Sequence, residues 1–251
     1  MDVKQSLLRH KMRIAALCFT VTSLFSAAAA AWQPINIDDD SVLRSPPSIA
    51  VRNGTLFFDG EIVKGSAAAL HQQLEMRRVE KVSFNSMGGD VKEAMAMGRE
   101  IHRRKVDVEV RNVCASACAN YIFPAGKNKF VTQNAYLLWH GSLHSPAADI
   151  ATVSGGKDHA PGELVASPEF IALKEQETQF YQQIGVSSDM PWCPQRQADY
   201  REKFPEKWFS WSQANLARFG VNHVRFATGA ARWQSTMSDR GVIFAEYCRS
   251  S

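Results

Sequence analysis

The middle of the sequence alternates between extended and helical patterns, with a repeat of about 30 residues. In "VDVEVR" the apolar residues Val106, Val108 and Val110 alternate with polar ones, which is typical of a strand with one buried face. "KVSF" at residues 81–84 predicts a shorter strand, and apolar residues at helical spacing predict a helix from about Asp90. Such an order indicates βαβ units with right-handed crossovers. The sequence therefore predicts an α/β fold with a largely parallel sheet.

Turn and capping signals define the other elements. The sequence predicts two extended pieces around an Asn-Gly turn and a helix capped by Ser66, with Leu70 and Leu74 on one face. It predicts a short buried helix in "CANYIFPAG", extended segments in "KFVTQNAYLLWHG" and a helix within residues 167–185. "SQANLARFG" predicts a short helix and "VNHVRF" a last strand. Residues 141–166 lack a sustained period and are predicted to form a loop.

The amino-terminal segment has the pattern of a secretory signal peptide. The basic stretch "MDVKQSLLRHKMR" precedes the apolar "IAALCFTVTSLF" and the small-residue "SAAAAAW". We expect residues 1–31 to be removed by cleavage near Ala31, with a retained membrane anchor as the alternative. Residues 32–46 are then a polar, proline-containing lead-in to the folded domain. The mature protein is expected to be periplasmic or secreted.

Charge gives no indication of a nucleic-acid partner. The full chain carries a net charge of +4, and the predicted signal peptide accounts for +3 of it. The mature protein is therefore close to neutral, and the basic isoelectric point reflects mostly the segment that is removed.

Cysteine usage agrees with export. Cys18 lies in the predicted signal peptide, which leaves Cys114, Cys118, Cys193 and Cys248 in the mature chain. An even number of cysteines in an exported protein indicates disulfides, and four cysteines allow three pairings. We favour Cys114–Cys118 and Cys193–Cys248, because one helical turn brings Cα atoms to about 6 Å, within disulfide reach. Free buried thiols are the alternative.

Three short motifs follow predicted strands, namely "SMGG", "CASAC" and "WHG". Loops at the carboxyl ends of parallel strands converge and tend to form sites. Ser116 in "CASAC" sits at a strand-to-helix turn, where a serine hydroxyl is exposed and the next backbone N–H, here of Ala117, points outward. His140 in "WHG" is a candidate base, and the glycines of "SMGG" can turn N–H groups toward an oxyanion. The alternative for each motif alone is a turn or packing role.

"FNSMGGDV", "CASACANYIFPAG" and "WHG" together resemble the core of the ClpP-type serine peptidases of the ClpP/crotonase fold. The resemblance covers about residues 55–145, and "SWSQANLARFGV" extends it to about residue 226. It implies repeated β-β-α units with a mainly parallel sheet and a C-terminal helical segment. A ClpP-like domain would then span residues 47–226, and residues 227–251 would form a C-terminal extension.

The same resemblance implies roles for individual residues. Ser116 would be the nucleophile and His140 the general base. The oxyanion would be held by the N–H groups of Gly88, Gly89 and Ala117. No cofactor and no metal are implied, and proteins of this fold often form homo-oligomers.

The chain departs from the family pattern at the third catalytic position. The register on "WSQANLARFG" places Trp208 where the family has its acid, and an indole cannot orient a histidine. The carboxylates that could replace it are Asp189, Asp199, Glu202 and Glu206. Cysteines around the serine are also unusual for cytosolic ClpP, and export excludes the cytosolic ATP-driven unfoldases that serve it.

The sequence thus predicts an exported, ATP-independent serine peptidase that hydrolyses peptides or unfolded protein. It implies no ATPase partner and no nucleic acid. The main alternative is a catalytically silent ClpP-like module for binding or assembly. A metal site of His140, His144, Asp158 and His159 is a further alternative, and a crotonase-type acyl-CoA enzyme is the least favoured because an exported protein lacks that substrate.

Overall fold

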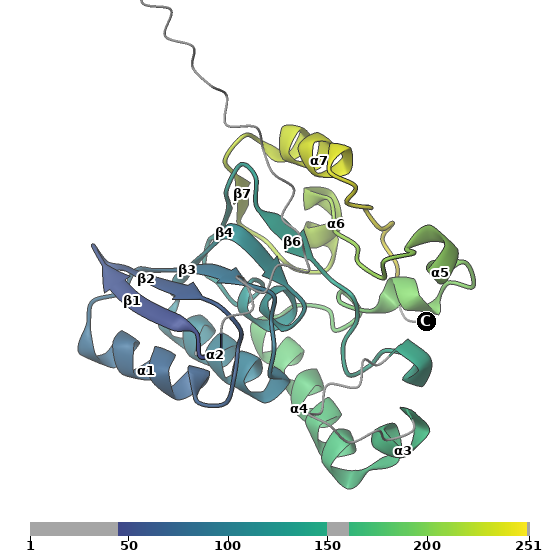
Figure 1. Ribbon diagram of the computed structural model, residues 1–251, viewed down its shortest axis with the longest axis horizontal. Helices are drawn as coiled ribbons and strands as arrows, with labels where there is room; N and C mark the ends of the chain where they lie inside the picture. Colours follow the sequence, from purple (N-terminus) through teal and green to yellow (C-terminus); the bar gives the residue numbers. More distant parts are fainter. Residues whose placement is uncertain (1–44, 150–160, 250–251) are drawn as a thin grey trace, which may run out of the picture. The chain divides into compact units, whose positions relative to one another are not determined.

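The computed structural model describes residues 45–149 and 161–249 (Figure 1). Its centre is a seven-stranded sheet in the order β1-β2-β3-β4-β5-β7, with β6 paired to β4. The β1–β2 pair is antiparallel, and every other pair of these strands is parallel. The strands are β1 (Ser48–Arg52), β2 (Thr55–Asp59), β3 (Lys81–Ser86), β4 (Asp107–Ala115), β5 (Lys129–Val131), β6 (Tyr136–Leu138) and β7 (Val224–Phe226). The predicted α/β class and the mainly parallel sheet are confirmed.

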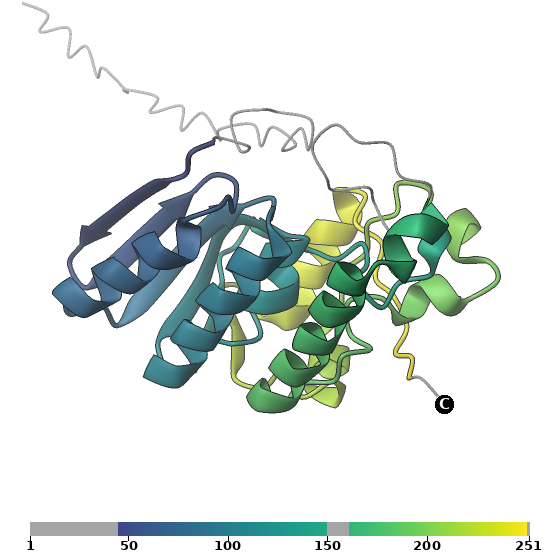
Figure 2. The ribbon, with the colours of Figure 1, turned by 90° about the horizontal axis from the view of Figure 1, so that it is seen from below.

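Helices cover this sheet, and α1, α2 and α4 pack side by side in one layer (Figure 2). The short π-helix η2 packs against α2, and α7 packs beside β7. The α-helices are α1 (Ser66–Met76), α2 (Val91–Arg104), α3 (Pro161–Ala166), α4 (Pro168–Ile184), α5 (Tyr200–Lys203), α6 (Gln213–Arg218) and α7 (Ala230–Asp239). The other helices are η2 (Cys118–Ile122), η3 (Ala147–Asp149) and η4 (Cys193–Arg196). No helix among the described residues is both long and apolar enough to cross a membrane.

Local sequence signals explain the first half of the fold. Asn53 and Gly54 both have positive φ, at 49° and 72°, as a two-residue hairpin turn between β1 and β2 requires. The Asp90 side chain caps α2 by accepting from the Glu93 N–H at 3.0 Å. Alternate residues are fully buried in β2 and in the first half of β4, as the period-2 pattern predicts, whereas consecutive residues are buried in β3 and at the end of β4, where both faces of the sheet are covered.

Two short strands share one edge of the long strand β4. β5 pairs with its first half, at Val108–Val110, and β6 pairs with its last three residues, Val113–Ala115. Since β4 and β6 are parallel, the residues that follow each of them emerge side by side. This arrangement brings two of the predicted motifs, "CASAC" and "WHG", to the same place.

Three predictions about local structure need correction or addition. Ser66 does not cap α1 but is its first residue; the helix follows Gly65 at φ 93°, and Ser66 Oγ accepts instead from the Val63 N–H at 3.0 Å. Residues 141–166 are not loop throughout, because they include η3 and α3, and Pro161 at the start of α3 already has a helical φ. Helix α7 lies in the extension 227–251, where no element was predicted, and buries Trp233 and Met237.

Several predicted segments lie outside the described residues. These are the signal peptide at residues 1–31, most of the lead-in at residues 32–46, and the part of the predicted loop at residues 150–160.

Candidate active site

Ser116 lies at the turn between β4 and η2. Its φ of 52° is in the left-handed region, which costs a non-glycine residue roughly 1–3 kcal/mol and is common at functional sites. The Ser116 N–H donates to the Leu138 carbonyl at 3.1 Å, and its own carbonyl accepts from the Asn120 N–H at 2.8 Å. The turn is therefore held from the β6 side and from the helix side, with the hydroxyl left to face a cavity.

His140 reaches Ser116 across 24 residues of sequence. Its Nε2 lies 2.6 Å from Ser116 Oγ, which is hydrogen-bond distance. The backbone around His140 is fixed by two buried amide side chains: Gln195 Nε2 donates to the His140 carbonyl at 3.0 Å, and Asn120 Nδ2 donates to the Gly141 carbonyl at 2.9 Å. The structure thus brings together the two residues that the sequence predicted as nucleophile and base.

The surroundings of His140 keep its imidazole neutral. Burial lowers the pKa of His140 to about 4, and the nearby positive charge of Lys207 adds to the effect. The Trp208 ring lies over the imidazole with a centroid distance of 4.3 Å. A neutral imidazole at pH 7 has a lone pair that can accept the Ser116 proton.

Trp208 reaches that position through a backbone bridge. Trp139 and Phe209 exchange two antiparallel hydrogen bonds, of 2.8 and 2.9 Å, so the residues next to them, His140 and Trp208, become neighbours. An aromatic ring therefore contacts the histidine from the segment where the family resemblance predicted a carboxylate.

The four carboxylates considered as replacements take other positions. Asp199 is exposed and pairs with Lys203 at 2.9 Å, and Glu202 and Glu206 are exposed. Asp189 is buried, and its charge acts on His144, where it partly offsets the lowering of the His144 pKa by burial. None of them contributes to the pKa shift of His140. The third catalytic residue is not identified by these contacts.

The predicted oxyanion donors lie around the same turn. A Cβ on Gly88 would come 2.7 Å from the Ala115 carbonyl oxygen and 2.8 Å from the Ala117 nitrogen, so the "SMGG" turn packs directly on the Ser116 turn. The Gly88 N–H donates to Ser86 Oγ at 3.1 Å and would have to exchange that partner to reach a substrate. Gly89 and Ala117 stay the predicted donors, and Ala117 lines the cavity at the start of η2.

A cavity of about 370 Å³ opens beside the Ser116–His140 pair. Its size falls within the range of small-molecule and peptide-side-chain sites. Its wall has apolar and charged parts from α2, η2, the loop after His140, α3 and α4. The lining includes Ser116, Ala117, Tyr121, His140, Leu143, Leu164, Phe170 and Leu173, together with Asp90, Lys92, Asp149 and Glu169. The arrangement can hold an apolar group next to the Ser116 hydroxyl.

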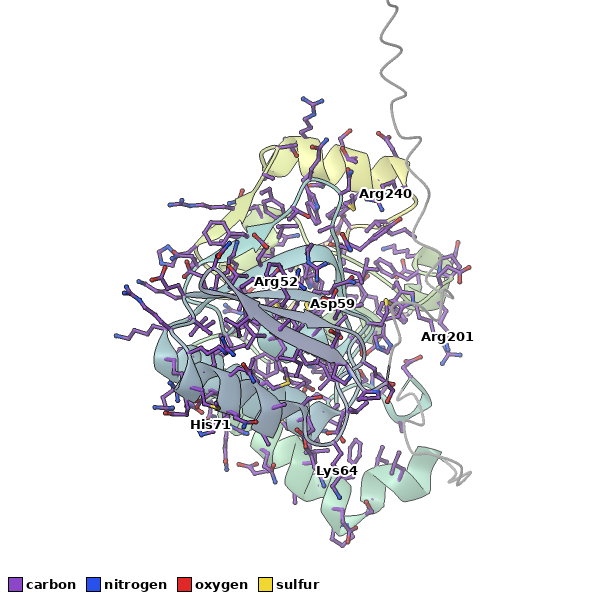
Figure 3. All side chains as sticks on the ribbon, turned by 60° about the vertical axis from the view of Figure 1, so that its left-hand side comes forward. Arg52, Asp59, Lys64, His71, Arg201 and Arg240 are labelled. Atoms are coloured by element: carbon purple, nitrogen blue, oxygen red, sulfur yellow. A yellow bond between two sulfur atoms is a disulfide. The ribbon has the colours of Figure 1, made fainter. Side chains whose placement is uncertain are left out.

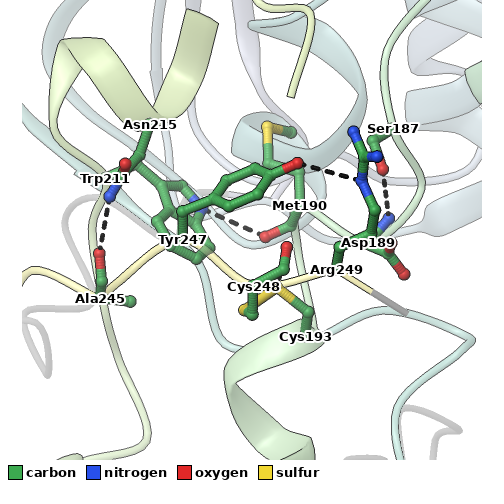
Figure 4. The surroundings of a disulfide bond; sticks show 10 residues. All are labelled: Ser187, Asp189, Met190, Cys193, Trp211, Asn215, Ala245, Tyr247, Cys248 and Arg249. Atoms are coloured by element: carbon green, nitrogen blue, oxygen red, sulfur yellow. Dashed lines mark hydrogen bonds between the residues drawn. A yellow bond between two sulfur atoms is a disulfide. The ribbon is translucent and has the colours of Figure 1, made fainter. Parts of the chain in front are cut away.

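Both favoured disulfides are present. Cys114 and Cys118, with Cα atoms 5.2 Å apart, bracket Ser116. The basis differs from the predicted single helical turn, because Cys114 is in β4 and Cys118 begins η2. Cys193 and Cys248 join η4 to the carboxyl-terminal segment, where Asn215 Nδ2 also donates to the Ala245 carbonyl at 3.2 Å (Figure 4). Closing a loop of 55 residues stabilises a folded protein by about 4 kcal/mol in the chain-entropy model.

The two disulfides give a direct test of oxidation state. We expect the mature protein, purified without reductant and then denatured, to titrate close to zero thiols, because all four of its cysteines are paired. Reduction of the denatured protein, followed by removal of the reductant, is the control and should expose all four, because Cys114, Cys118 and Cys193 are buried in the native state. Four thiols without reduction would contradict the disulfides.

The alternative metal site is not supported by the positions of its described members. His140 Nε2 faces Ser116, and His144 Nε2 lies 3.2 Å from Thr178 Oγ1. Asp158 and His159 lie outside the described residues. One other group of the described residues has metal-compatible spacing, formed by His71 and Glu75 on α1 and Glu100 on α2; Figure 3 labels His71. Arginines already pair with both of its carboxylates, which indicates a surface ion-pair network.

Two supporting residues were missed by the sequence analysis. Asn120 and Gln195 are 3% and 7% exposed and hold the backbone of the base. The role of Asn120 could have been predicted, because an amide side chain within a mainly apolar, buried helix needs hydrogen-bond partners. Gln195 lies in an irregular polar segment and gave no comparable signal.

No protein-family model and no curated protein sequence matches the chain. The geometry of the Ser116–His140 pair and its surroundings is therefore the main indication of what the chain does.

Proposed function

We propose that this protein is an exported serine hydrolase that cleaves peptides with Ser116 as nucleophile and His140 as general base. The observation on which the proposal rests is the 2.6 Å contact between Ser116 Oγ and His140 Nε2, two residues that line the cavity. Nucleophilic serines are activated by a base within this distance. We further propose that the fold is of the ClpP/crotonase type.

In the proposed reaction, Ser116, His140 and the backbone N–H donors each act at a defined step. His140 Nε2 takes the Ser116 proton as Oγ bonds to the substrate carbonyl carbon, and the carbonyl oxygen becomes an oxyanion near the Ala117 and Gly89 N–H groups. The C–N bond breaks as His140 returns the proton to the leaving amine. A water molecule, deprotonated by His140, then attacks the acyl-enzyme, and the regenerated Ser116 Oγ recovers its proton.

The substrate proposed is a peptide or an unfolded protein segment. A cavity of this size accepts a side chain but not a folded domain, and its apolar lining favours an apolar one. Two disulfides support an oxidising compartment such as the periplasm or the exterior. In such a compartment we propose that hydrolysis proceeds without an ATPase partner and without a cofactor. Homo-oligomer formation stays a prediction of the family resemblance.

One observation favours a second candidate, a silent ClpP-like module for binding or assembly. Trp208 occupies the side of His140 where an orienting carboxylate was sought. In the well-studied serine triad, loss of that carboxylate costs about ten-thousandfold in rate. A binding or assembly module that contains the Ser116–His140 pair but does not catalyse hydrolysis would have the same cavity and the same turn at Ser116.

Covalent labelling separates the two candidates. We expect mature protein to react with a fluorophosphonate, because this probe traps an activated serine, and the adduct should map to Ser116 by peptide mass spectrometry. Heat-denatured protein is the control and should not react. The absence of an adduct on natively folded protein would reject the hydrolase and favour the module.

A further inference from the structure

Glu177 on α4 is a buried carboxyl group that the proposed mechanism does not use. Its side chain is fully buried, and Oε1 accepts from the Tyr121 hydroxyl at 2.6 Å. Among the described residues, Oε2 makes no hydrogen bond of ideal geometry, and its nearest polar neighbours are on the loop after His140. Burying a carboxyl group is costly unless it has polar partners, so the groups around Glu177 are held close to it.

Glu177 contacts both parts of the candidate site. Tyr121 belongs to η2, the helix that begins directly after the Ser116 turn, and it lines the cavity. On the other side, the Ser142 hydroxyl and the Leu143 N–H face the carboxyl group closely enough to lower its pKa. His144 Nε2 lies 3.7 Å from Oε2. One carboxyl group therefore lies between the helix of the nucleophile and the loop that follows the base.

That loop is short and directly continues His140. The Ser142 N–H donates to Ser145 Oγ at 2.9 Å, and the His144 N–H donates to Ser142 Oγ at 3.1 Å. Ser142 is thus shared between the internal bonds of the loop and Glu177. A shift of Ser142 would be transmitted through Gly141 to the His140 ring.

We propose that Glu177 is a positioning residue, which seats the loop of residues 141–145 against η2 and so sets where the His140 ring lies. The relevance of this position for catalysis rests on the proposed function, whereas the seating of the loop does not.

Because Glu177 can ionise, a positioning role predicts that opening of the loop depends on pH. A role in packing alone would not predict this dependence. Burial raises the pKa of Glu177 from its ordinary 4.5 to about 7. The titratable or charged groups that face it are Tyr121 on η2, His144 on the loop, and Lys174 and Tyr181 on α4 itself. A group with a raised pKa in the closed state holds its proton there, so the closed loop is favoured at low pH. Raising the pH from 4.5 to 7 should therefore favour opening, by on the order of a hundredfold.

Two histidines act in the opposite direction. The pKa values of His140 and His144 are lowered by burial, so their protonation at low pH favours opening. The pH dependence of loop opening in the wild type therefore combines opposing effects. The contribution of Glu177 is obtained by comparing the wild type with a variant that cannot ionise at position 177.

The test is amide hydrogen exchange of residues 141–145 in the mature protein, between about pH 5 and about pH 8. Glu177→Gln keeps the shape but cannot ionise, and Glu175→Gln is the matched control on the exposed side of the same helix. We expect the wild-type and Glu175→Gln proteins to lose protection with rising pH relative to Glu177→Gln, approaching a hundredfold across the interval. Equal profiles in all three proteins would overturn the proposal.

Tyr121→Phe provides a second variant in case Glu177→Gln does not fold. It removes a hydrogen bond that lowers the pKa of Glu177, so the loss of protection should move to higher pH. An unmoved profile in a folded Tyr121→Phe protein would overturn the proposal as well.

Fluorophosphonate labelling separates this inference from the proposed function. If wild-type Ser116 reacts, Glu177→Gln should change the pH dependence of its labelling, while Glu175→Gln should not; no difference between them would overturn the positioning role. If wild-type Ser116 does not react, the proposed function fails, and hydrogen exchange still decides whether Glu177 seats the loop.

Discussion

Covalent labelling of Ser116 is expected to slow by about a hundredfold to ten-thousandfold in His140→Ala, and to disappear in Ser116→Ala. The reason is the 2.6 Å contact between the two side chains, which allows Nε2 to remove the hydroxyl proton as the bond to the probe forms. The measurement is the second-order rate of adduct formation with a fluorophosphonate, followed by intact mass.

The pH dependence of the same reaction should identify the base. Burial lowers the pKa of His140 to about 4, so the imidazole stays neutral in mildly acidic solution and is protonated only below about pH 4. A protonated imidazole cannot accept the Ser116 proton, so labelling should persist well below the ordinary histidine pKa and then fall. His71→Ala, on the exposed surface of α1, is the control and should leave the rate unchanged. A His140→Ala rate equal to wild type would favour the silent module.

The parts of the fold that the sequence predicted well are those with local causes. The alternating valines of β4, the Asp90 cap of α2 and the Asn53-Gly54 turn each act within a few residues. Ser66 was wrongly predicted as the N-cap of α1 for the same reason. Serine is a favourable capping residue, but Gly65 before it has a left-handed φ and takes the N-cap position. Local chemistry alone does not decide between two neighbouring residues.

The Ser116–His140 pair was predictable because it follows from topology. Ser116 directly follows β4 and His140 comes two residues after the end of β6, and the two parallel strands pair along Val113–Ala115, so their carboxyl ends lie together. The contact between Trp208 and His140 depends on an isolated bridge between Trp139 and Phe209, so only the register of the family resemblance indicated Trp208 there, and local patterns did not. Such a bridge has no sequence signature.

For Glu177, the sequence predicts burial but not the contacts of the side chain. It lies seven residues after Phe170 and three before Phe180, so helical spacing places it on the buried stripe of α4. A glutamate on such a stripe is a signal that the sequence analysis did not use. Its partners, Tyr121 and the loop after His140, depend on how α4 packs and could not be inferred from spacing.

Gly88→Ala is expected to slow the labelling of Ser116 by about a hundredfold or more, since displacing a reacting group by about 1 Å costs on that order. The added Cβ would lie 2.7 Å from the Ala115 carbonyl oxygen, 2.8 Å from the Ala117 nitrogen and 3.0 Å from the Ser116 Cβ. These are backbone atoms and the Cβ of the nucleophile, so no flexible side chain can yield. The turn itself must move, and with it the hydroxyl and the Ala117 N–H.

The matched control is Gly65→Ala, which separates steric contact from backbone strain. Gly65 and Gly88 have similar positive φ values, 93° and 100°, so alanine strains the backbone at either position by roughly 1–2 kcal/mol. A Cβ on Gly65 meets no atom within 4 Å. We therefore expect both variants to lose thermal stability, but only Gly88→Ala to lose labelling. If the two variants react with the probe equally fast, the packing of the "SMGG" turn on Ser116 does not set the position of the nucleophile.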